Sequence, residues 1–289
     1  MRRWARHGRA SLLLGRLVPV RRPPVLVLGM PRSGTTWVGR TLGDAPNALY
    51  FNEPLSEVHV AERRGATYFE VDPTNPPDSY VWPLRFAAAG VPAFGTRTSS
   101  GISLFGRLGQ RVVIKEVNPL AIDWFLQELA PTLIYVVRHP AAVAVSLHER
   151  GWDWPVYEQR FLPTTVLPEV GASFWARIGA IQGVALRMAT AAATTATISY
   201  EDLCADPHAC FRDLYDIADL EWTASVAASL QASTSGSLTR GADDPTGTNR
   251  DTPAMANAWR SRITAAQLAD VRSGWEATRP SRYAVDADW

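Results

Sequence analysis

The residues best suited to chemistry lie first in the loop of residues 29–36, with the sequence GMPRSGTT. The loop follows the apolar run 25–28, which has the continuous hydrophobicity of a strand buried on both faces of a parallel sheet. Thr35 is expected to open a helix, whose first amide N–H groups and dipole favour an anion at that end. The side-chain donors of the loop are Arg32, Ser33, Thr35 and Thr36. The loop is therefore predicted to bind phosphate or sulfate, although an ordinary glycine turn would have the same outline.

The loop departs from the nucleotide P-loop pattern, G-x-x-x-x-G-K-[ST], at one position. Gly29 and Gly34 have the right spacing, and Thr36 fits the final hydroxyl. Thr35, however, stands in place of the lysine that reaches the β- and γ-phosphates. A loop without that lysine suits a donor with fewer phosphates. The segment PRSGTTW at 31–37 resembles the 5′-phosphosulfate-binding loop of sulfotransferases that use 3′-phosphoadenosine-5′-phosphosulfate (PAPS).

A second segment, IYVVRHPAAVAVSLHER at 134–150, resembles the 3′-phosphate-binding segment of the same family. In that segment a strand ends in Arg and a Ser follows eight residues later, which are Arg138 and Ser146 here. Arg138 is expected where open α/β sheets bind ligands, and its guanidinium fork suits a phosphate. Ser146 is six residues beyond Pro140, roughly 9 Å along the expected helix, so its hydroxyl can share the same anion.

Further resemblances complete the expected nucleotide site. SYEDLCADP at 199–207 is similar to a family segment whose tyrosine, Tyr200 here, approaches the adenine. NRDTPAMANAWRSRIT at 249–264 resembles the late loop that lends a basic residue to the 3′-phosphate, and Arg250 is the best match. The resemblance also implies that Trp37 stacks on the adenine, whereas a buried aromatic residue on a helix is the alternative.

The catalytic residues are implied by comparing branches of the family. Cytosolic aryl and steroid sulfotransferases take a histidine base from a K-T-H segment, but residues 115–117 read Lys-Glu-Val here. The tyrosylprotein and carbohydrate enzymes instead have Arg in the loop and Glu at the end of the next strand, matching Arg32 and Glu53. Lys115 looks like the K-x-P lysine beside the sulfuryl group. The resemblance thus implies Glu53, Arg32 and Lys115 as the catalytic set.

Each of these assignments has an alternative. Glu53 could instead cap the turn before Pro54, and Lys115 could be a surface residue at a strand end. If Glu53 is not the base, the other candidates are His59, His139 and His148. His139 directly follows the expected phosphate-binding arginine, so ordering that loop is its alternative role.

Apolar runs alternate with helical patterns along the chain, which predicts a single α/β domain with a P-loop-like, doubly wound, mostly parallel sheet flanked by helices. Residues 23–289 are assigned to this domain, and residues 1–22 to a basic N-terminal extension. Residues 55–110 are rich in Pro and Gly and are expected to form an excursion or lid on the acceptor side. The expected strands are 25–28, 47–54, 111–115, 132–137 and 197–200. The later helices are expected at 120–130, from Pro140, at 171–193, from Pro207, at 254–260 and at 265–278.

Composition limits the partners. A net charge of +1 gives no electrostatic case for nucleic acid. Two cysteines, Cys204 and Cys210, and five scattered histidines match no disulfide framework or metal motif, so a reducing cytoplasm and no metal are expected. The N-terminal apolar stretch is interrupted by Arg16 and is too short to span a bilayer. Its arginines could still contact an anionic membrane surface.

Together these patterns predict a cytoplasmic, PAPS-dependent sulfotransferase that acts on a hydroxyl and releases 3′-phosphoadenosine-5′-phosphate (PAP). The segment EPLSEVHV at 53–60 resembles the carbohydrate branch and favours a carbohydrate, glycolipid or small-metabolite acceptor. The alternatives are a P-loop kinase or NTPase, and a non-catalytic PAP-binding protein. The aromatic residues expected to line an acceptor pocket, or else to form small satellite cores, are Trp82, Trp152, Trp154 and Tyr157.

Overall fold

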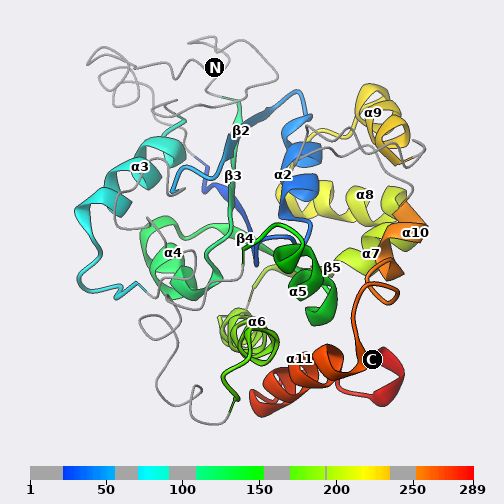
Figure 1. The fold of residues 1–289 in the computed structure, drawn as a ribbon. Helices are drawn as coiled ribbons and strands as arrows, with labels where there is room; N and C mark the ends of the chain where they lie inside the picture. The colour runs from blue at the N-terminus through cyan, green and yellow to red at the C-terminus, as the bar shows by residue number, and fades with distance from the viewer. Residues whose placement is uncertain (1–21, 56–70, 91–108, 153–169, 193, 235–251) are drawn as a thin grey trace.

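The computed structural model describes residues 22–55, 71–90, 109–152, 170–192, 194–234 and 252–289. At its centre lies a parallel five-stranded sheet with the strand order β2-β3-β1-β4-β5 (Figure 1). Its strands are β1 (Val25–Gly29), β2 (Ala48–Asn52), β3 (Arg111–Glu116), β4 (Thr132–Val137) and β5 (Ala196–Ser199). Because all strands run the same way, their carboxyl ends meet at one edge of the sheet, where the loops that follow them converge.

Helices cover both faces of the sheet because residues of opposite parity along each strand face opposite sides. Leu26 and Leu28 face a core built with α3 (Asp78–Ala88), α4 (Ile122–Leu129) and α6 (Phe174–Ala191). Val25 and Val27 face the other core. The helices of that second core are α2 (Thr35–Gly43), α7 (Tyr200–Ala205), α8 (Pro207–Ala218) and α9 (Ala224–Thr234).

A third apolar cluster lies beside the carboxyl edge of the sheet. It joins α5 (Pro140–His148) to α6 and α11 (Ala265–Ala277), with Met30 of the loop after β1 packed against them. The remaining elements are the 3₁₀ turns η3 (Pro119–Ala121) and η6 (Asp286–Asp288) and the short helix α10 (Thr252–Asn257). In Figure 1, α10 lies beside α7, and the last residues of the chain lie beyond α11.

The predicted fold class is confirmed. The doubly wound parallel sheet forms, and Pro140 and Pro207 open α5 and α8 as expected because proline suits the first helical position. One local prediction was wrong. Tyr200 was assigned to a strand but begins α7, since Ser199 caps the helix by accepting a hydrogen bond from the Asp202 amide at 3.0 Å. In addition, no helix was predicted within residues 55–110, yet α3 lies there.

The prediction missed α3 because Pro83 lies inside the helix, a position usually taken as a break. The helix forms because its buried face, including Tyr80 and Leu84, packs on the sheet. The predicted N-terminal extension up to residue 21 and the rest of the excursion, 56–70 and 91–108, lie outside the described residues. Within the described ranges, no helix is long and apolar enough to cross a membrane.

The helices α6 and α11 cross with their backbones almost in contact, and glycines allow this approach. A Cβ atom built on Gly274 of α11 would fall deep inside contact distance of the Ala176 carbonyl oxygen of α6, and 3.0 Å from the Ala180 nitrogen. A Cβ on Gly179 of α6 would meet the backbone of α11 at Val271 in the same way. The atoms that would clash belong to backbone and cannot rotate away.

We expect Gly274→Ala to destabilise the fold. Alanine gains about 1 kcal/mol of intrinsic helix propensity over glycine. Forcing apart two packed helices costs typically about 1–3 kcal/mol, and this cost should prevail. Chemical denaturation should therefore show a net loss of up to about 2 kcal/mol. Gly171→Ala is the matched control, since a Cβ there meets nothing within 4 Å. A Gly274→Ala protein as stable as the wild type would contradict the proposed close packing.

Candidate active site

The loop after β1 adopts the conformation of an anion-binding turn. Gly34 caps α2 with a φ of 103°, and Arg32 has a φ of 71°, so two residues of the loop are left-handed. Ser33 turns inward, and its hydroxyl donates to the Met30 carbonyl at 2.7 Å. The hydrogen bonds that α2 forms to Gly34 begin at Trp37, so the amides of Thr35 and Thr36 belong to the first turn, which a helix leaves available for a ligand.

Glycine is required at position 34 for two reasons. Its φ is one that L side chains rarely adopt. A Cβ there would also lie 2.6 Å from the ring of Tyr200. The loop therefore lies directly against Tyr200, which is itself 2% exposed. This contact brings the first residue after β5 to the loop after β1.

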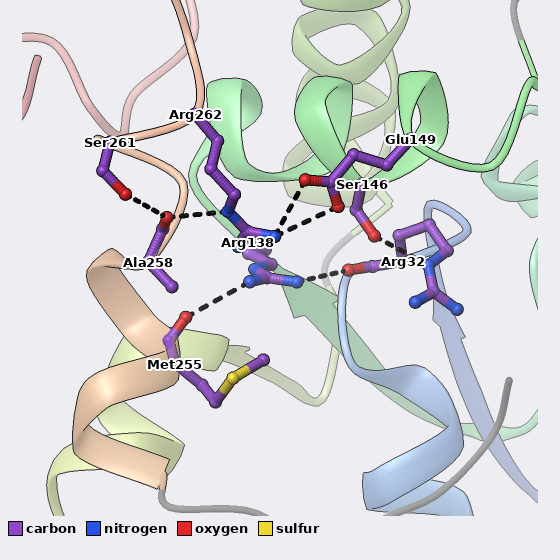
Figure 2. Close-up of polar contacts among 8 residues, drawn as sticks. All are labelled: Arg32, Arg138, Ser146, Glu149, Met255, Ala258, Ser261 and Arg262. Carbon is purple, nitrogen blue, oxygen red and sulfur yellow. Dashed lines mark hydrogen bonds and ion pairs between the residues drawn. The ribbon is translucent and has the colours of Figure 1, made fainter. Parts of the chain in front are cut away.

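Arg32 joins the two segments that the sequence assigned to the nucleotide site. Its Nε donates to the Ser146 hydroxyl on α5 at 2.9 Å. Its backbone carbonyl accepts a hydrogen bond from the Arg138 guanidinium at 3.1 Å. Figure 2 shows both hydrogen bonds, which join Arg32 to Ser146 and to Arg138. The structure thus brings the glycine loop and the Arg-x₇-Ser segment into one site.

Arg138 is a buried cation without an acidic partner among the described residues. It lies at the end of β4 and is 7% exposed. Its other contacts are a long hydrogen bond of 3.5 Å to the Met255 carbonyl of α10 and the face of the Tyr200 ring, 4.2 Å from the guanidinium carbon. Its Nε is buried without a hydrogen-bond partner in the described residues. Since a buried charge is costly unless it is paired, this guanidinium is suited to receive an anion.

The ends of β2 and β3 bring Glu53 and Lys115 together. Lys115 shares the parity of Val113, so it lies on the α2 face of the sheet beneath Gly39, and it is 1% exposed. Its ammonium group forms an ion pair with the Glu53 carboxylate. Because Lys115 is buried, it is not the surface residue of the alternative interpretation. The Glu53 side chain is 30% exposed and can therefore meet a solute.

The turn that carries Glu53 is fastened to β3 at two points. The Glu53 amide donates to the Lys115 carbonyl at 2.7 Å, which holds Glu53 at a φ of 50°. Two residues later, the Leu55 amide donates to a carboxylate oxygen of Glu116 at 2.7 Å. Glu116 is fully buried, so this bond is shielded from water. A left-handed φ is costly for a residue with a side chain, so the surrounding contacts must impose it.

The other predicted ligands lie in the first turn of α2 or outside the described residues. Thr35 is buried and Thr36 half-buried at the start of α2. Trp37 is 8% exposed and packs edge-on against Tyr200 and Phe211, which is the core packing of the alternative interpretation. The candidates outside the described residues are Arg250, His59, Trp154 and Tyr157.

Two residues near the site were missed by the sequence analysis. Glu116 was passed over because the predicted strand ended one residue earlier, at 115; its position directly after an apolar run was the available signal. Met255 contributes through its backbone carbonyl, which no side-chain pattern reports. In the described part of the chain, no group of three or more His, Cys, Asp or Glu side chains could hold a metal ion.

With the geometry established, comparison with known proteins decides the family. A family model described as "Sulfotransferase domain" matches residues 22–272. The chain belongs to this sulfotransferase family. The match spans the sheet, the glycine loop and the segment of Arg138 and Ser146. Sulfuryl transfer is the activity of this family in general.

Solved sulfotransferase structures share the fold. The sulfotransferase domain of the Synechococcus PCC 7002 olefin synthase is 20% identical, with a TM-score of 0.51 over 89% of this chain and 94% of that chain. The sulfotransferase domain from the curacin biosynthetic pathway is 14% identical, with a TM-score of 0.50 over 89% of this chain and 98% of that chain. Mouse sulfotransferase SULT7A1, complexed with PAP, is 14% identical, with a TM-score of 0.47 over 96% and 92%. No curated protein sequence matches the chain.

The two remaining histidine candidates have different surroundings. His148 is exposed at the end of α5 and contacts the ring of Trp175. His139 is 4% exposed and caps α5, with its Nδ1 accepting a hydrogen bond from the Ala141 amide at 3.2 Å. Burial, and then the positive charges of Arg260 and Arg138, lower the pKa of His139 to about 3. A buried, neutral imidazole that uses one nitrogen as a helix cap orders the loop.

This pKa predicts that stability falls on mild acidification. Between about pH 6.5 and pH 3 the unfolded chain protonates His139 while the folded chain does not, so unfolding becomes more favourable as pH falls. The loss approaches about 1.4 kcal/mol per pH unit for one proton. Urea unfolding at pH 7.5, 6.5 and 5.5 should show it. In His139→Asn, which keeps a capping oxygen but does not titrate, the slope should be smaller. Parallel slopes would contradict the assignment.

Proposed function

We propose that the chain transfers the sulfuryl group of PAPS to a hydroxyl of a carbohydrate, glycolipid or small-metabolite acceptor. Two hydrogen bonds of Arg32 carry this proposal. Its side chain donates to the Ser146 hydroxyl, and its backbone carbonyl accepts from the Arg138 guanidinium. These bonds place a phosphosulfate-type loop and a separate buried cation in one site. A donor with an anion at each end, 5′-phosphosulfate and 3′-phosphate, fits that arrangement.

The residues of the proposed donor site form two groups, one for each anionic end of the donor. The first-turn amides of α2, with Thr35 and Thr36, face the 5′ end of the donor. Arg138 meets the 3′-phosphate, because its buried guanidinium has no carboxylate partner among the described residues. Ser146 adds a hydroxyl near the same anion. The ring of Tyr200 lies against both Gly34 and the Arg138 guanidinium.

The proposed reaction is a direct in-line displacement. Glu53 takes the proton of the acceptor hydroxyl while its oxygen forms a bond to sulfur. The bond between sulfur and the bridging oxygen of the phosphosulfate breaks, and that oxygen leaves with the electron pair on the phosphate of PAP. Arg32 and Lys115 stabilise the negative charge that develops on the transferring and leaving oxygens. The proton thus goes to Glu53 and the electron pair leaves with PAP, so the reaction needs no further reactant.

The ion pair between Glu53 and Lys115 positions both groups for this step. Lys115 is almost fully buried, so its ammonium is restricted to the direction in which Glu53 lies. Glu53 is held on its turn by the backbone bond to Lys115. Base and cation are therefore arranged before the acceptor arrives, which lowers the reorganisation that the reaction requires.

Binding of nucleotides to Arg138→Ala tests the donor site. Calorimetry should show that PAP binding weakens by about 1.5–3 kcal/mol, as expected for the loss of a charge-assisted hydrogen bond. Adenosine 5′-phosphosulfate, which lacks the 3′-phosphate, should lose much less. Equal losses would show that Arg138 does not read the 3′-phosphate. In the wild type, a preference for ATP over PAP would favour a kinase or NTPase instead.

Glu53→Gln tests the proposed base. The amide keeps the shape of the side chain but cannot take up a proton, so turnover should fall roughly 10²–10⁴-fold. PAP affinity should stay within about 0.5 kcal/mol of the wild type. Glu128→Gln is the matched control, because Glu128 also forms an ion pair, with Arg85, but on the outer helices α4 and α3. A decrease of only a few-fold in Glu53→Gln would exclude Glu53 as the base.

A further inference from the structure

The segment that follows the proposed phosphate-binding arginine is fastened to the last residues of the chain through one carboxylate. The backbone amide of His139 donates to Oε1 of Glu201 at 3.1 Å. The other oxygen of the same carboxylate, Oε2, accepts the hydroxyl of Tyr283 at 2.8 Å. Glu201 lies in the first turn of α7, directly after Tyr200, whose ring carries the Arg138 guanidinium. Residue 283 is thus connected in two hydrogen bonds to the residue next to Arg138.

Three aromatic rings contact the imidazole of His139. The ring of Trp259 stacks on the imidazole at 4.4 Å between centroids, nearly parallel at 14°. Tyr283 and Trp289 contact it edge-on at 5.0 and 4.8 Å. We call residues 279–289 the terminal strap, since they pass over this imidazole.

The terminal strap is held by its own polar contacts. Arg260, just after α10, donates to the carbonyls of Trp289 at 2.8 Å and Asp288 at 3.0 Å. The indole nitrogen of Trp289 donates to the Tyr283 carbonyl at 3.1 Å. Burial, and then the charge of Glu201, raise the pKa of Tyr283, so its hydroxyl keeps the proton that it donates. The strap is therefore held in place by hydrogen bonds, and the Tyr283 hydroxyl donates one to Glu201.

The strap lies outside the region matched by the family model, which ends at residue 272. Within the described residues, Arg138 forms its hydrogen bonds and ring contact with Arg32, Met255 and Tyr200 and not with the strap, so any influence of the strap on the donor must pass through Glu201 and His139. Arg138 is sensitive to such influence. Its guanidinium is held by two backbone carbonyls and one ring, so a shift of the 138–139 backbone is not corrected by a carboxylate partner in the described residues.

We propose that the terminal strap is a positioning element of the donor site, in which Tyr283 acts through Glu201 and His139 to orient Arg138. Tyr283 is then a positioning residue for the anion at the 3′ end of the donor and touches no reacting atom. This inference rests on the proposed function, because it takes the 3′-phosphate as the ligand of Arg138. A strap that merely covered apolar surface would stabilise the fold without distinguishing one nucleotide from another.

Tyr283→Phe is the decisive variant, because it keeps the ring against His139 and removes one hydroxyl. Calorimetry with PAP and with AMP, which lacks the 3′-phosphate, isolates the contribution of that group. We expect Tyr283→Phe to weaken PAP binding about fivefold, equivalent to about 1 kcal/mol, and to change AMP binding less than about twofold. The KM for PAPS should rise by a similar factor while kcat stays within about twofold. Val285→Ala is the matched control, since Val285 is on the same strap and 59% exposed.

A double-mutant cycle with Arg138→Ala supplies the second measurement. If Tyr283 acts through Arg138, Tyr283→Phe should cost almost nothing more once the guanidinium is absent. An unchanged PAP-to-AMP ratio in Tyr283→Phe, or an additive loss in the double variant, would overturn the positioning role. A wild type that binds PAP no better than AMP would instead refute the proposed function. The two failures are therefore distinguishable.

Discussion

The buried guanidinium of Arg138 is the constraint around which this end of the molecule is built. A cation that is 7% exposed and lacks a carboxylate partner in the described residues must be supported by dipoles and rings. The Arg32 carbonyl, the Met255 carbonyl and the face of Tyr200 provide that support, and each comes from a different part of the chain. Their arrangement leaves the site electropositive before a ligand binds. An anionic donor would complete the charge balance.

The same constraint explains why the glycine loop has its shape. Arg32 can reach both Arg138 and Ser146 only if the loop folds back over the end of β4, and its left-handed φ of 71° accomplishes this turn. Gly34 then brings the loop against the Tyr200 ring, under the start of α2. Arg262 pairs with Glu149 at 3.0 Å, which ties the segment after α10 to the end of α5 beside this site (Figure 2).

A region of balanced charge lies elsewhere on the same edge of the sheet. There the cation and carboxylate are supplied together, by Lys115 on β3 and by Glu53 directly after the adjacent strand β2. Glu116 fixes the following turn from within the core. Arg138 after β4 has no carboxylate partner among the described residues, whereas Lys115 at the end of β3 is paired. This contrast is consistent with one end of the site binding an anion and the other exchanging a proton. The parallel order β2-β3-β1-β4-β5 places the glycine loop between them.

The sequence by itself determined the fold class and the position of the glycine loop, although it missed α3. Continuous apolar runs, helix-opening prolines and the glycine loop depend on contacts within a few residues, so the fold class and the loop could be predicted from local patterns. Only the tertiary structure decided which distant groups meet. Arg32 bonds to residues 106 and 114 positions away, and Glu201 joins residue 139 to residue 283. Such contacts follow from strand order and packing, because burial of the whole sheet fixes which loops share an edge.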